Sequence, residues 1–401
     1  MPTSSTARLP PLDAWKRVIE NSELCARASA TNAASVADVE RLRRQWPADD
    51  VAAALSLVDA RRRLTRKFSG AERLCADREA AEQATSEVVA SWKAERFAAA
   101  GANSIEDRCS GMGGDAMSLA RVAPTIAIDA SDVRAWMTSV NAECATIVGD
   151  AADSALRALF LHIDPARRDE AAGRRSFDFG EHSPSATICF DLARCARGGA
   201  VKLGPGLPLP LPSALGAADS LEIEVISDCG MLVQAVCWFG ALARNRGFRT
   251  ATMLPHRITL SDTPSDAPTD SEFRRYLYVA NSAIERAGLL GTLARRLGLR
   301  ERSRGLGILT GHEEIVDPWL NGYEILAKPR PRQSDVAREL SRLGAHGARV
   351  RTRGGSADAD AWTKALRTGS GLELDVFLLR AGSTLEAIIA RPLADPVSCS
   401  T

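Results

Sequence analysis

Residues 105–129 read I-E-D-R-C-S-G-M-G-G-D-A-M-S-L-A-R-V-A-P-T-I-A-I-D. This stretch predicts a strand that ends at Asp107, a glycine-rich turn, a helix over residues 116–123 and a second strand over residues 125–128. Together they form one βαβ unit of the nucleotide-binding type, in which the ligand lies at the carboxyl ends of the strands. Asp129 follows the second strand and is expected to face the ribose hydroxyls of an adenosine.

The turn has an acid on each side. Gly111, Gly113 and Gly114 let its backbone adopt positive φ and approach a ligand closely. A dinucleotide site instead needs G-x-G-x-x-G opening directly into the helix, which sets a pyrophosphate on the helix N-terminus. Asp107 and Asp115 would repel a pyrophosphate but would suit the ammonium and sulfonium groups of S-adenosylmethionine. The alternative is a glycine-rich turn that only connects a strand to a helix.

Composition is typical of a soluble globular protein with two or three domains. The chain has 401 residues, of which 45% are hydrophobic and 25% charged, and its formal net charge is +1. Any basic surface must therefore be local. Since no apolar run reaches the length of a membrane span and the N-terminus does not resemble a signal peptide, we expect no membrane association and a cytoplasmic location.

The cysteines and histidines predict no metal site. The nine cysteines are dispersed without a C-x-x-C pair, and the five histidines do not cluster beside them. His162 lies within a predicted strand and is expected to be a packed histidine rather than a base. An odd number of dispersed cysteines fits a reducing compartment.

The pattern of apolar residues divides the chain into four parts. Residues 1–100 are expected to be a helical region, and residues 101–260 alternate strands with helices, the helices including residues 132–142, 152–159 and 187–196. That alternation predicts an α/β fold with a doubly wound, mostly parallel, Rossmann-like sheet. Residues 261–322 are expected to hold a polar linker and a long helix over residues 278–302, and residues 323–396 a small α/β domain. Its expected strands are residues 323–328, 348–353, 372–379 and 385–390, and its expected helices are residues 334–343 and 358–367.

Three arginines alternate along one predicted strand of this small domain. Arg349, Arg351 and Arg353 therefore point to the same face. Burying three unpaired charges would be very costly, so these side chains must be exposed, paired or binding an anion.

Acids end successive strands along the predicted sheet: Asp107, Asp129, Asp150, and Asp164 with Pro165. This series resembles the class I (Rossmann-like) S-adenosylmethionine-dependent methyltransferases, and more closely those with a C-terminal THUMP-like domain. Four stretches carry the resemblance, over roughly residues 60–396. They are Glu82-Gln83-Ala84-Thr85, the C-S-G-M-G-G-D turn, Asp164-Pro165-Ala166-Arg167-Arg168 and Arg351-Thr352-Arg353-Gly354-Gly355.

The resemblance implies a role for each matching residue. Asp107, Gly111 and Gly113 would hold the methionine moiety, with Asp115 nearby. Asp129 would bind the ribose and Asp150 the adenine amino group, whereas Asp164 and Pro165 would line the acceptor pocket as catalytic residues. The chain departs from the family pattern in two places: Cys109 replaces the first glycine of the turn, and Ala166 and Arg167 replace the proline and aromatic of nucleic-acid amino-methyltransferases.

We therefore expect a methyltransferase that acts on RNA, with S-adenosylmethionine as its cofactor. Arg167, Arg168, Arg351 and Arg353 are the candidate contacts to substrate phosphates, because guanidinium groups bind phosphate bidentately. The first two could instead pair with neighbouring acids. Two other functions remain open, a methyltransferase with a protein or small-molecule acceptor and a non-catalytic RNA-binding protein. The sequence assigns no oligomeric state.

Overall fold

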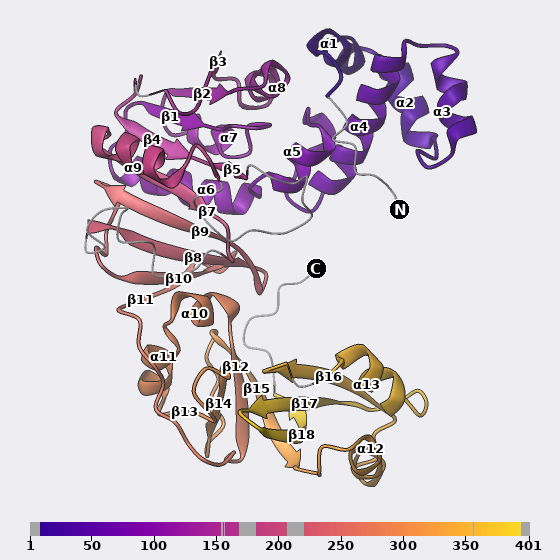
Figure 1. Ribbon diagram of the computed structural model, residues 1–401, viewed down its shortest axis with the longest axis vertical. Coiled ribbons are helices and arrows are strands. Elements are labelled where there is room, and N and C mark those ends of the chain that lie inside the picture. Colours follow the sequence, from indigo (N-terminus) through magenta and orange to yellow (C-terminus); the bar gives the residue numbers. More distant parts are fainter. Residues whose placement is uncertain are drawn as a thin grey trace. The chain divides into compact units, whose positions relative to one another are not determined.

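A computed structural model describes residues 9–153, 155, 157–167, 182–206, 220–355 and 357–393. The chain forms two compact units, residues 1–226 with 233–247 and residues 227–232 with 248–401. Both combine helices with β-sheet (Figure 1). In the described part of the chain, no helix is long and apolar enough to span a membrane.

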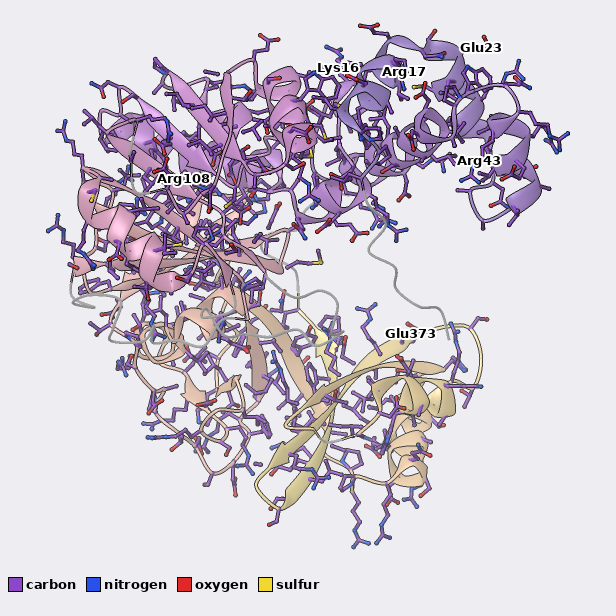
Figure 2. The ribbon with its side chains drawn as sticks, turned by 45° about the horizontal axis from the view of Figure 1, so that its top comes forward. Lys16, Arg17, Glu23, Arg43, Arg108 and Glu373 are labelled. Atoms are coloured by element: carbon purple, nitrogen blue, oxygen red, sulfur yellow. The ribbon has the colours of Figure 1, made fainter. Side chains whose placement is uncertain are left out.

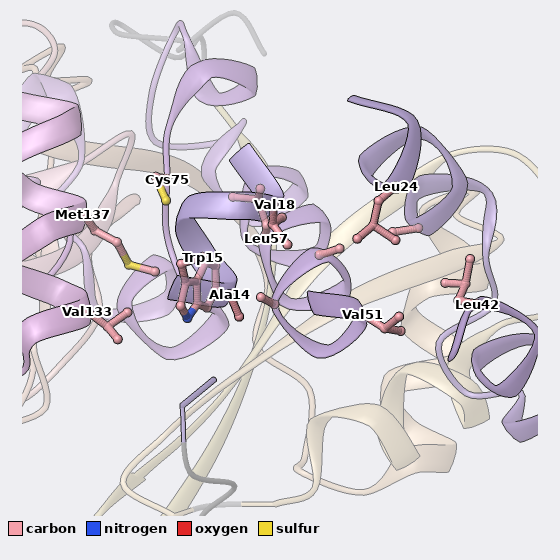
Figure 3. Packing of buried hydrophobic residues seen from close by; sticks show 13 residues of the cluster. Ala14, Trp15, Val18, Leu24, Leu42, Val51, Leu57, Cys75, Val133 and Met137 are labelled. Atoms are coloured by element: carbon pink, nitrogen blue, oxygen red, sulfur yellow. The ribbon is translucent and has the colours of Figure 1, made fainter. Parts of the chain in front are cut away.

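The first unit begins with helices, as predicted for this part of the chain: α1 (Leu12–Glu20), α2 (Ser22–Ala30), α3 (Val36–Arg43), α4 (Ala48–Leu64), α5 (Arg78–Gln83) and α6 (Glu87–Ala99). Polar side chains cap several of them; Asp77, for example, accepts from the Ala80 amide at the start of α5. The apolar faces of α1 to α4 form a core around Trp15, to which α8 (Asp132–Ala142) contributes Val133 and Met137 (Figure 3). This core joins the helical region to the sheet.

The sheet of the first unit is mixed. Five of its strands are parallel to their neighbours, in the order β3-β2-β1-β4-β7, and β7 then pairs antiparallel with β9 beside β8. The strands are β1 (Ile105–Arg108), β2 (Thr125–Asp129), β3 (Ala145–Val148), β4 (Phe160–Ile163), β7 (Gly198–Leu203), β8 (Glu222–Asp228) and β9 (Met231–Gly240).

The strand order reverses between β1 and β4. From β1, the chain adds β2 and β3 on one side of the sheet and β4 and β7 on the other. In open α/β sheets, ligands bind outside the carboxyl ends of the strands at such a switch point. The connections include α7 (Ala116–Leu119), shorter than predicted, α8, and α9 (Ala186–Cys195), which agrees with the expected helix.

One predicted helix of this unit is wrong. Residues 152–159 were expected to be helical, but those that the structure describes form turns and bends before β4. The buried guanidinium of Arg108, labelled in Figure 2, donates to the carbonyls of Ala151 and Ala155 at 2.8 Å each. The side chain thus takes carbonyls that a helix would pair with backbone amides. After β4, β5 (Ala166–Arg167) and β6 (His182–Ser183) form a short antiparallel pair.

The second unit has its own sheet, with the order β13-β14-β12-β15-β18-β17-β16. Its strands are β12 (Tyr276–Ala280), β13 (Arg300–Glu301), β14 (Ile308–Gly311), β15 (Leu320–Ala327), β16 (Gly347–Arg353), β17 (Glu373–Ala381) and β18 (Thr384–Pro392). Its helices are α10 (Ser282–Ala287), α11 (Leu290–Leu297), α12 (Gln333–Arg342) and α13 (Ala359–Leu366). The unit also contains the antiparallel pair β10 (Arg249–Leu254) and β11 (Ile258–Asp262).

The long helix predicted over residues 278–302 is wrong. Strand β12 occupies its first part, and two short helices follow. Gly288 and Gly298, with φ of 73° and 67°, end these helices in the left-handed conformation that glycine adopts without strain. The polar stretch of residues 261–272, expected as a linker, is an ordered segment: the Ser265 amide donates to the Gly288 carbonyl at 3.0 Å and the Asp270 amide to the Glu301 carbonyl at 2.8 Å.

The predicted elements of residues 323–396 are confirmed in type, because β15 to β18 and two helices alternate as expected. However, β15 also pairs with β12, so this sheet extends beyond the proposed small domain. The expected domain boundaries therefore remain predictions.

Candidate active site at the ends of the parallel strands

Four acids lie at or just after the carboxyl ends of adjacent parallel strands. Asp107 lies in β1 opposite Ala127 and His162, and Asp129 ends β2. Asp150 and Asp164 follow β3 and β4. Because the strands are parallel, all four acids lie at one edge of the sheet, around the switch point.

The glycine turn is tied to the end of β2 by Asp129. Its two carboxylate oxygens accept from the Gly111 and Ser131 amides, each at 2.9 Å. Gly111 has φ of 60°, and a Cβ there would meet no atom within 4 Å, so open space lies against its backbone. Gly113 has φ of 88° and is needed for packing, since a Cβ would lie 3.1 Å from Thr138. The turn is thus braced on one side and open at Gly111.

Cys109 occupies the turn without acting as a nucleophile. Its φ is 61°, a left-handed value that is unusual for a non-glycine residue. Burial, followed by the Asp164 and Asp129 carboxylates, raises the pKa of its thiol well above the ordinary value. The group is therefore a neutral thiol at physiological pH. It is unreactive as a nucleophile, because only a thiolate would react.

Behind the turn lies a buried charged cluster of Lys93, Asp107, Asp115 and His162. Lys93 Nζ lies 2.6 Å from Asp115 Oδ1 and 3.1 Å from His162 Nε2, and His162 Nδ1 lies 2.7 Å from Asp107 Oδ1. An ammonium can only donate, so His162 Nε2 accepts a hydrogen bond from Lys93. The ring proton is then on Nδ1, which donates a hydrogen bond to Asp107. Each side chain is less than a tenth exposed.

This cluster contains two carboxylates and one ammonium, with a neutral imidazole. Burial acts to raise the pKa of Asp115, but the Lys93 ammonium, with that of Lys202, brings it below the ordinary value. For Asp107, burial prevails over the hydrogen bond from His162, and its pKa is raised. Among the residues that the structure describes, the buried Asp107 Oδ2 has no hydrogen-bond partner. An ionised Asp107 would thus leave one negative charge unbalanced, and a cationic donor would balance it.

On the far side of the turn, Asp164 pairs with Lys202. Lys202 Nζ lies 2.7 Å from Asp164 Oδ2 and donates to the Gln83 carbonyl at 3.3 Å. Thr85 donates its hydroxyl proton to Asp115 Oδ2 at 2.8 Å. The Glu82-Gln83-Ala84-Thr85 stretch, which the resemblance singled out, therefore lies at the site. Pro165 is buried beside Asp164.

Sequence reasoning missed Lys93 and Lys202. A signal for them existed: the chain has only six lysines among 51 Lys and Arg residues. Where arginine is so strongly preferred, a lysine in an apolar helix or strand marks a place that needs a compact point charge. His162 was expected to be packed rather than a base, and it is fully buried.

Within the described structure, Asp150 is not joined to this network. Asp150 is exposed and accepts from the Ala152 amide at 2.8 Å, so the adenine contact assigned to it remains a prediction. Arg167 ends β5, but its side chain and the whole of Arg168 lie outside the described part of the chain.

In the second unit, two of the three arginines on β16 are paired. Arg351 Nε lies 2.8 Å from Asp375 Oδ1, and Arg353 Nη2 lies 3.0 Å from Glu285 Oε1. Arg349 is exposed and has no partner among the residues described. No cluster of potential metal ligands occurs in the described part of the chain.

Comparison with known proteins points to one class of enzyme. The chain is 29% identical over 327 residues to an uncharacterised S-adenosylmethionine-dependent methyltransferase of Mycobacterium tuberculosis, known from strains H37Rv and CDC 1551. The match covers 78% of this chain and 88% of the relative. No family model matches the chain.

The fold is also found in a solved structure. A crystal structure from Porphyromonas gingivalis W83, provisionally named a methyltransferase, superposes with a TM-score of 0.71 at 16% identity. The match covers 96% of this chain and 98% of that one. The chain therefore has a methyltransferase-like α/β fold with large mixed sheets.

Proposed function

We propose that this chain transfers a methyl group to RNA. It is an S-adenosylmethionine-dependent methyltransferase, like the relatives that share most of its length. One observation carries the proposed cofactor site: the buried, unpartnered Oδ2 of Asp107 beside a glycine turn that Asp129 holds open at Gly111. A cofactor bearing an ammonium and a sulfonium supplies the positive charge that this carboxylate lacks.

The residues around the switch point fit the parts of that cofactor. Asp107 would pair with the amino group of the methionine moiety, and the exposed backbone at Gly111 would lie against it. Asp129 would bind the ribose through the lone pairs left over from its two backbone bonds. Asp150, at the end of the next strand, would reach the adenine amino group.

In catalysis, the main role of this chain is to position the reacting groups. When bound, S-adenosylmethionine supplies an electrophilic methyl carbon, whose bond to sulfur breaks as the acceptor's lone pair forms the new bond and the acceptor loses its proton. Asp164 has one oxygen on Lys202, and its Oδ1 has no partner among the described residues, so Oδ1 would accept a hydrogen bond from the acceptor N–H or O–H. Pro165 would form an apolar wall beside it. Alignment of this kind supplies much of the rate enhancement.

RNA as the acceptor is supported by basic residues in the second unit. Phe273, Arg274, Arg275, His312 and Lys328 line a pocket of about 480 Å³ beside β15. Arg274 pairs with Asp270 and Arg275 with Glu324.

The segment that follows the pocket offers freer charges. Lys328 is exposed, and Arg330 and Arg332, also exposed, have no acidic partner among the residues described. Lys328 donates its ammonium to the Phe273 carbonyl at 2.7 Å, so the guanidinium groups free to bind phosphate are those of Arg330, Arg332 and Arg349. The paired Arg351 and Arg353 would contribute less, because a phosphate must first displace their carboxylates.

Transfer of a labelled methyl group from S-adenosylmethionine tests the acceptor class. Purified protein is incubated with total RNA and, separately, with total protein; Asp107→Asn serves as the inactive control. We expect label in RNA with the wild type only. Label that enters protein alone would contradict the RNA assignment. Label in neither would mean that neither RNA nor protein is the acceptor.

A further inference from the structure

The segment between α5 and α6 is fixed at the active site by two lysines and a threonine. Lys67 Nζ donates to the carbonyls of Ala81, Glu82 and Ala84 at 3.0, 2.6 and 2.8 Å, which uses all three ammonium protons. These bonds satisfy carbonyls at the C-terminal end of α5 that have no helical partner. The helical region is thus anchored immediately before Thr85.

Lys202 makes the second attachment. Its ammonium bridges the Asp164 carboxylate and the Gln83 carbonyl, and its side chain is only 15% exposed. The bridge links β7 to the acid after β4 and to a segment more than a hundred residues earlier in the chain. One end of the bridge is Asp164, the residue proposed to face the methyl acceptor.

Thr85 makes the third attachment, to the glycine turn. Its hydroxyl donates to Asp115 at 2.8 Å, and a Cβ at Gly114 would lie 3.3 Å from the Thr85 carbonyl oxygen. The close approach leaves little room for the segment to shift relative to the turn. Residues 83–85 are therefore held from two directions, by the turn and by Lys202.

We propose that Lys202 is a positioning residue, which orients the Asp164 carboxylate and fixes residues 83–85 as a wall of the acceptor pocket. This inference rests on the proposed function. Lys202 occupies Asp164 Oδ2 and leaves Oδ1 for the acceptor, so the carboxylate has one orientation rather than several. The helical region thereby completes the active site instead of only packing against the sheet.

Lysine suits this task better than an apolar residue of the same length. An ammonium donates to a carboxylate and a carbonyl at once, whereas Lys202→Met keeps the length and removes both bonds. Lys202→Arg keeps the charge. Lys364→Met, at an exposed lysine of α13 in the second unit, is the matched control.

Three measurements on the full chain test the role of Lys202. The first is the affinity for S-adenosylmethionine by calorimetry, which Lys202→Met should leave within about threefold, because Lys202 contacts no residue assigned to the methionine or ribose. The second is amide hydrogen exchange over residues 81–86 without cofactor. Loss of the Gln83 bond should speed that exchange about five- to tenfold, and Lys202→Arg should largely prevent the change.

The third measurement is turnover with labelled methyl donor and whichever of total RNA or total protein accepts label. Misplacement of Asp164 should lower kcat about 10- to 100-fold in Lys202→Met, with little change in the KM for S-adenosylmethionine. Lys364→Met should match the wild type in all three measurements.

Wild-type exchange in Lys202→Met, or faster exchange with undiminished kcat, would overturn the proposal. If Lys202→Met does not fold, Lys202→Gln, which removes the ammonium, replaces it, and unchanged exchange over residues 81–86 together with unchanged kcat would likewise overturn the proposal. If no acceptor takes label, the exchange result decides alone. Absence of S-adenosylmethionine binding by the wild type would instead refute the proposed function.

Discussion

Asp107 shows how one residue can indicate a ligand. Its Oδ1 accepts a hydrogen bond from His162 Nδ1, while Oδ2 has no partner within the described structure although the side chain is 1% exposed. An unsatisfied buried acceptor costs about 1–3 kcal/mol, and more when charged. The neighbouring ammonium of Lys93 is already committed to Asp115 at 2.6 Å. The remaining charge is best balanced by a cationic ligand.

The raised pKa of Asp107 predicts that affinity for S-adenosylmethionine falls with acidification. Burial raises the pKa of this carboxyl, so protonation begins above the ordinary range near pH 4. The ligand's ammonium pairs with the ionised form, and binding below the raised pKa must release a proton. Affinity should therefore be weaker at pH 5.5 than at pH 7.5.

Calorimetry at these two pH values, in buffers of different ionisation enthalpy, would measure both the affinity and the proton release. Asp107→Asn should bind more weakly and lose this component of the pH dependence. An identical pH dependence in the wild type and in Asp107→Asn would assign the titration to another group.

At the scale of elements, the buried ion pair between Lys93 and Asp115 links α6 to the glycine turn. Through His162 and Asp107 the same cluster reaches β4 and β1. Four parts of the first unit are therefore held by a few polar contacts in a dry environment. Such contacts are strong only while every partner is present.

Lys93→Met should destabilise the protein by about 3–5 kcal/mol, because it leaves Asp115 buried without its cation. The double variant Lys93→Met/Asp115→Asn should recover part of that loss, since the unpaired charge is gone. Urea unfolding measures both free energies. Arg27→Met, which removes an exposed pair with Glu23, should cost about 0–1 kcal/mol. A comparably small cost for Lys93→Met would mean that the cluster is not buried in solution.

The elements that could be predicted from sequence are those whose signals are local. The bounds of α8 were predicted correctly, because Ser131 caps its start and an apolar stripe follows. The acids at the strand ends followed from the same alternation of strands and helices. By contrast, residues 278–302 combine the end of an apolar strand with two amphipathic helices, and their pattern resembles one long helix when the glycine signals are given too little weight.

The contacts of the site could not be predicted, because they join distant parts of the chain. Lys93 meets Asp115, and Lys202 meets both Gln83 and Asp164. No periodicity reports such tertiary pairs. The prediction of a methyltransferase that uses S-adenosylmethionine is confirmed, whereas the assigned site residues and the RNA acceptor remain proposals.

At the scale of the whole molecule, similarity to the Mycobacterium tuberculosis relative extends over 78% of the chain. The matched region is therefore longer than the part of the chain that forms either sheet. The formal net charge of +1 leaves no general attraction for nucleic acid, so an RNA contact must depend on local groups such as Arg330 and Arg332.

Salt-dependent RNA binding distinguishes the two sets of arginines. Each phosphate contact on single-stranded RNA contributes about 0.7 to the slope of log affinity against log salt. Arg330→Ala/Arg332→Ala should therefore lower the slope by about 1.4, if each arginine makes one contact. Arg351→Ala/Arg353→Ala should lower it less, since these side chains are paired. The opposite order would move the phosphate contact to β16.

Calorimetric titration of S-adenosylmethionine into the wild type and Asp129→Ala tests the central claim most directly. We predict saturable binding at one site in the wild type and a loss of at least about 100-fold, or 2.7 kcal/mol, in Asp129→Ala, which removes the ribose acceptor and the brace on Gly111. Asp13→Ala, at an exposed acid in α1, should bind like the wild type. Absence of binding by the wild type, or undiminished affinity in Asp129→Ala, would contradict a cofactor site at the ends of the parallel strands.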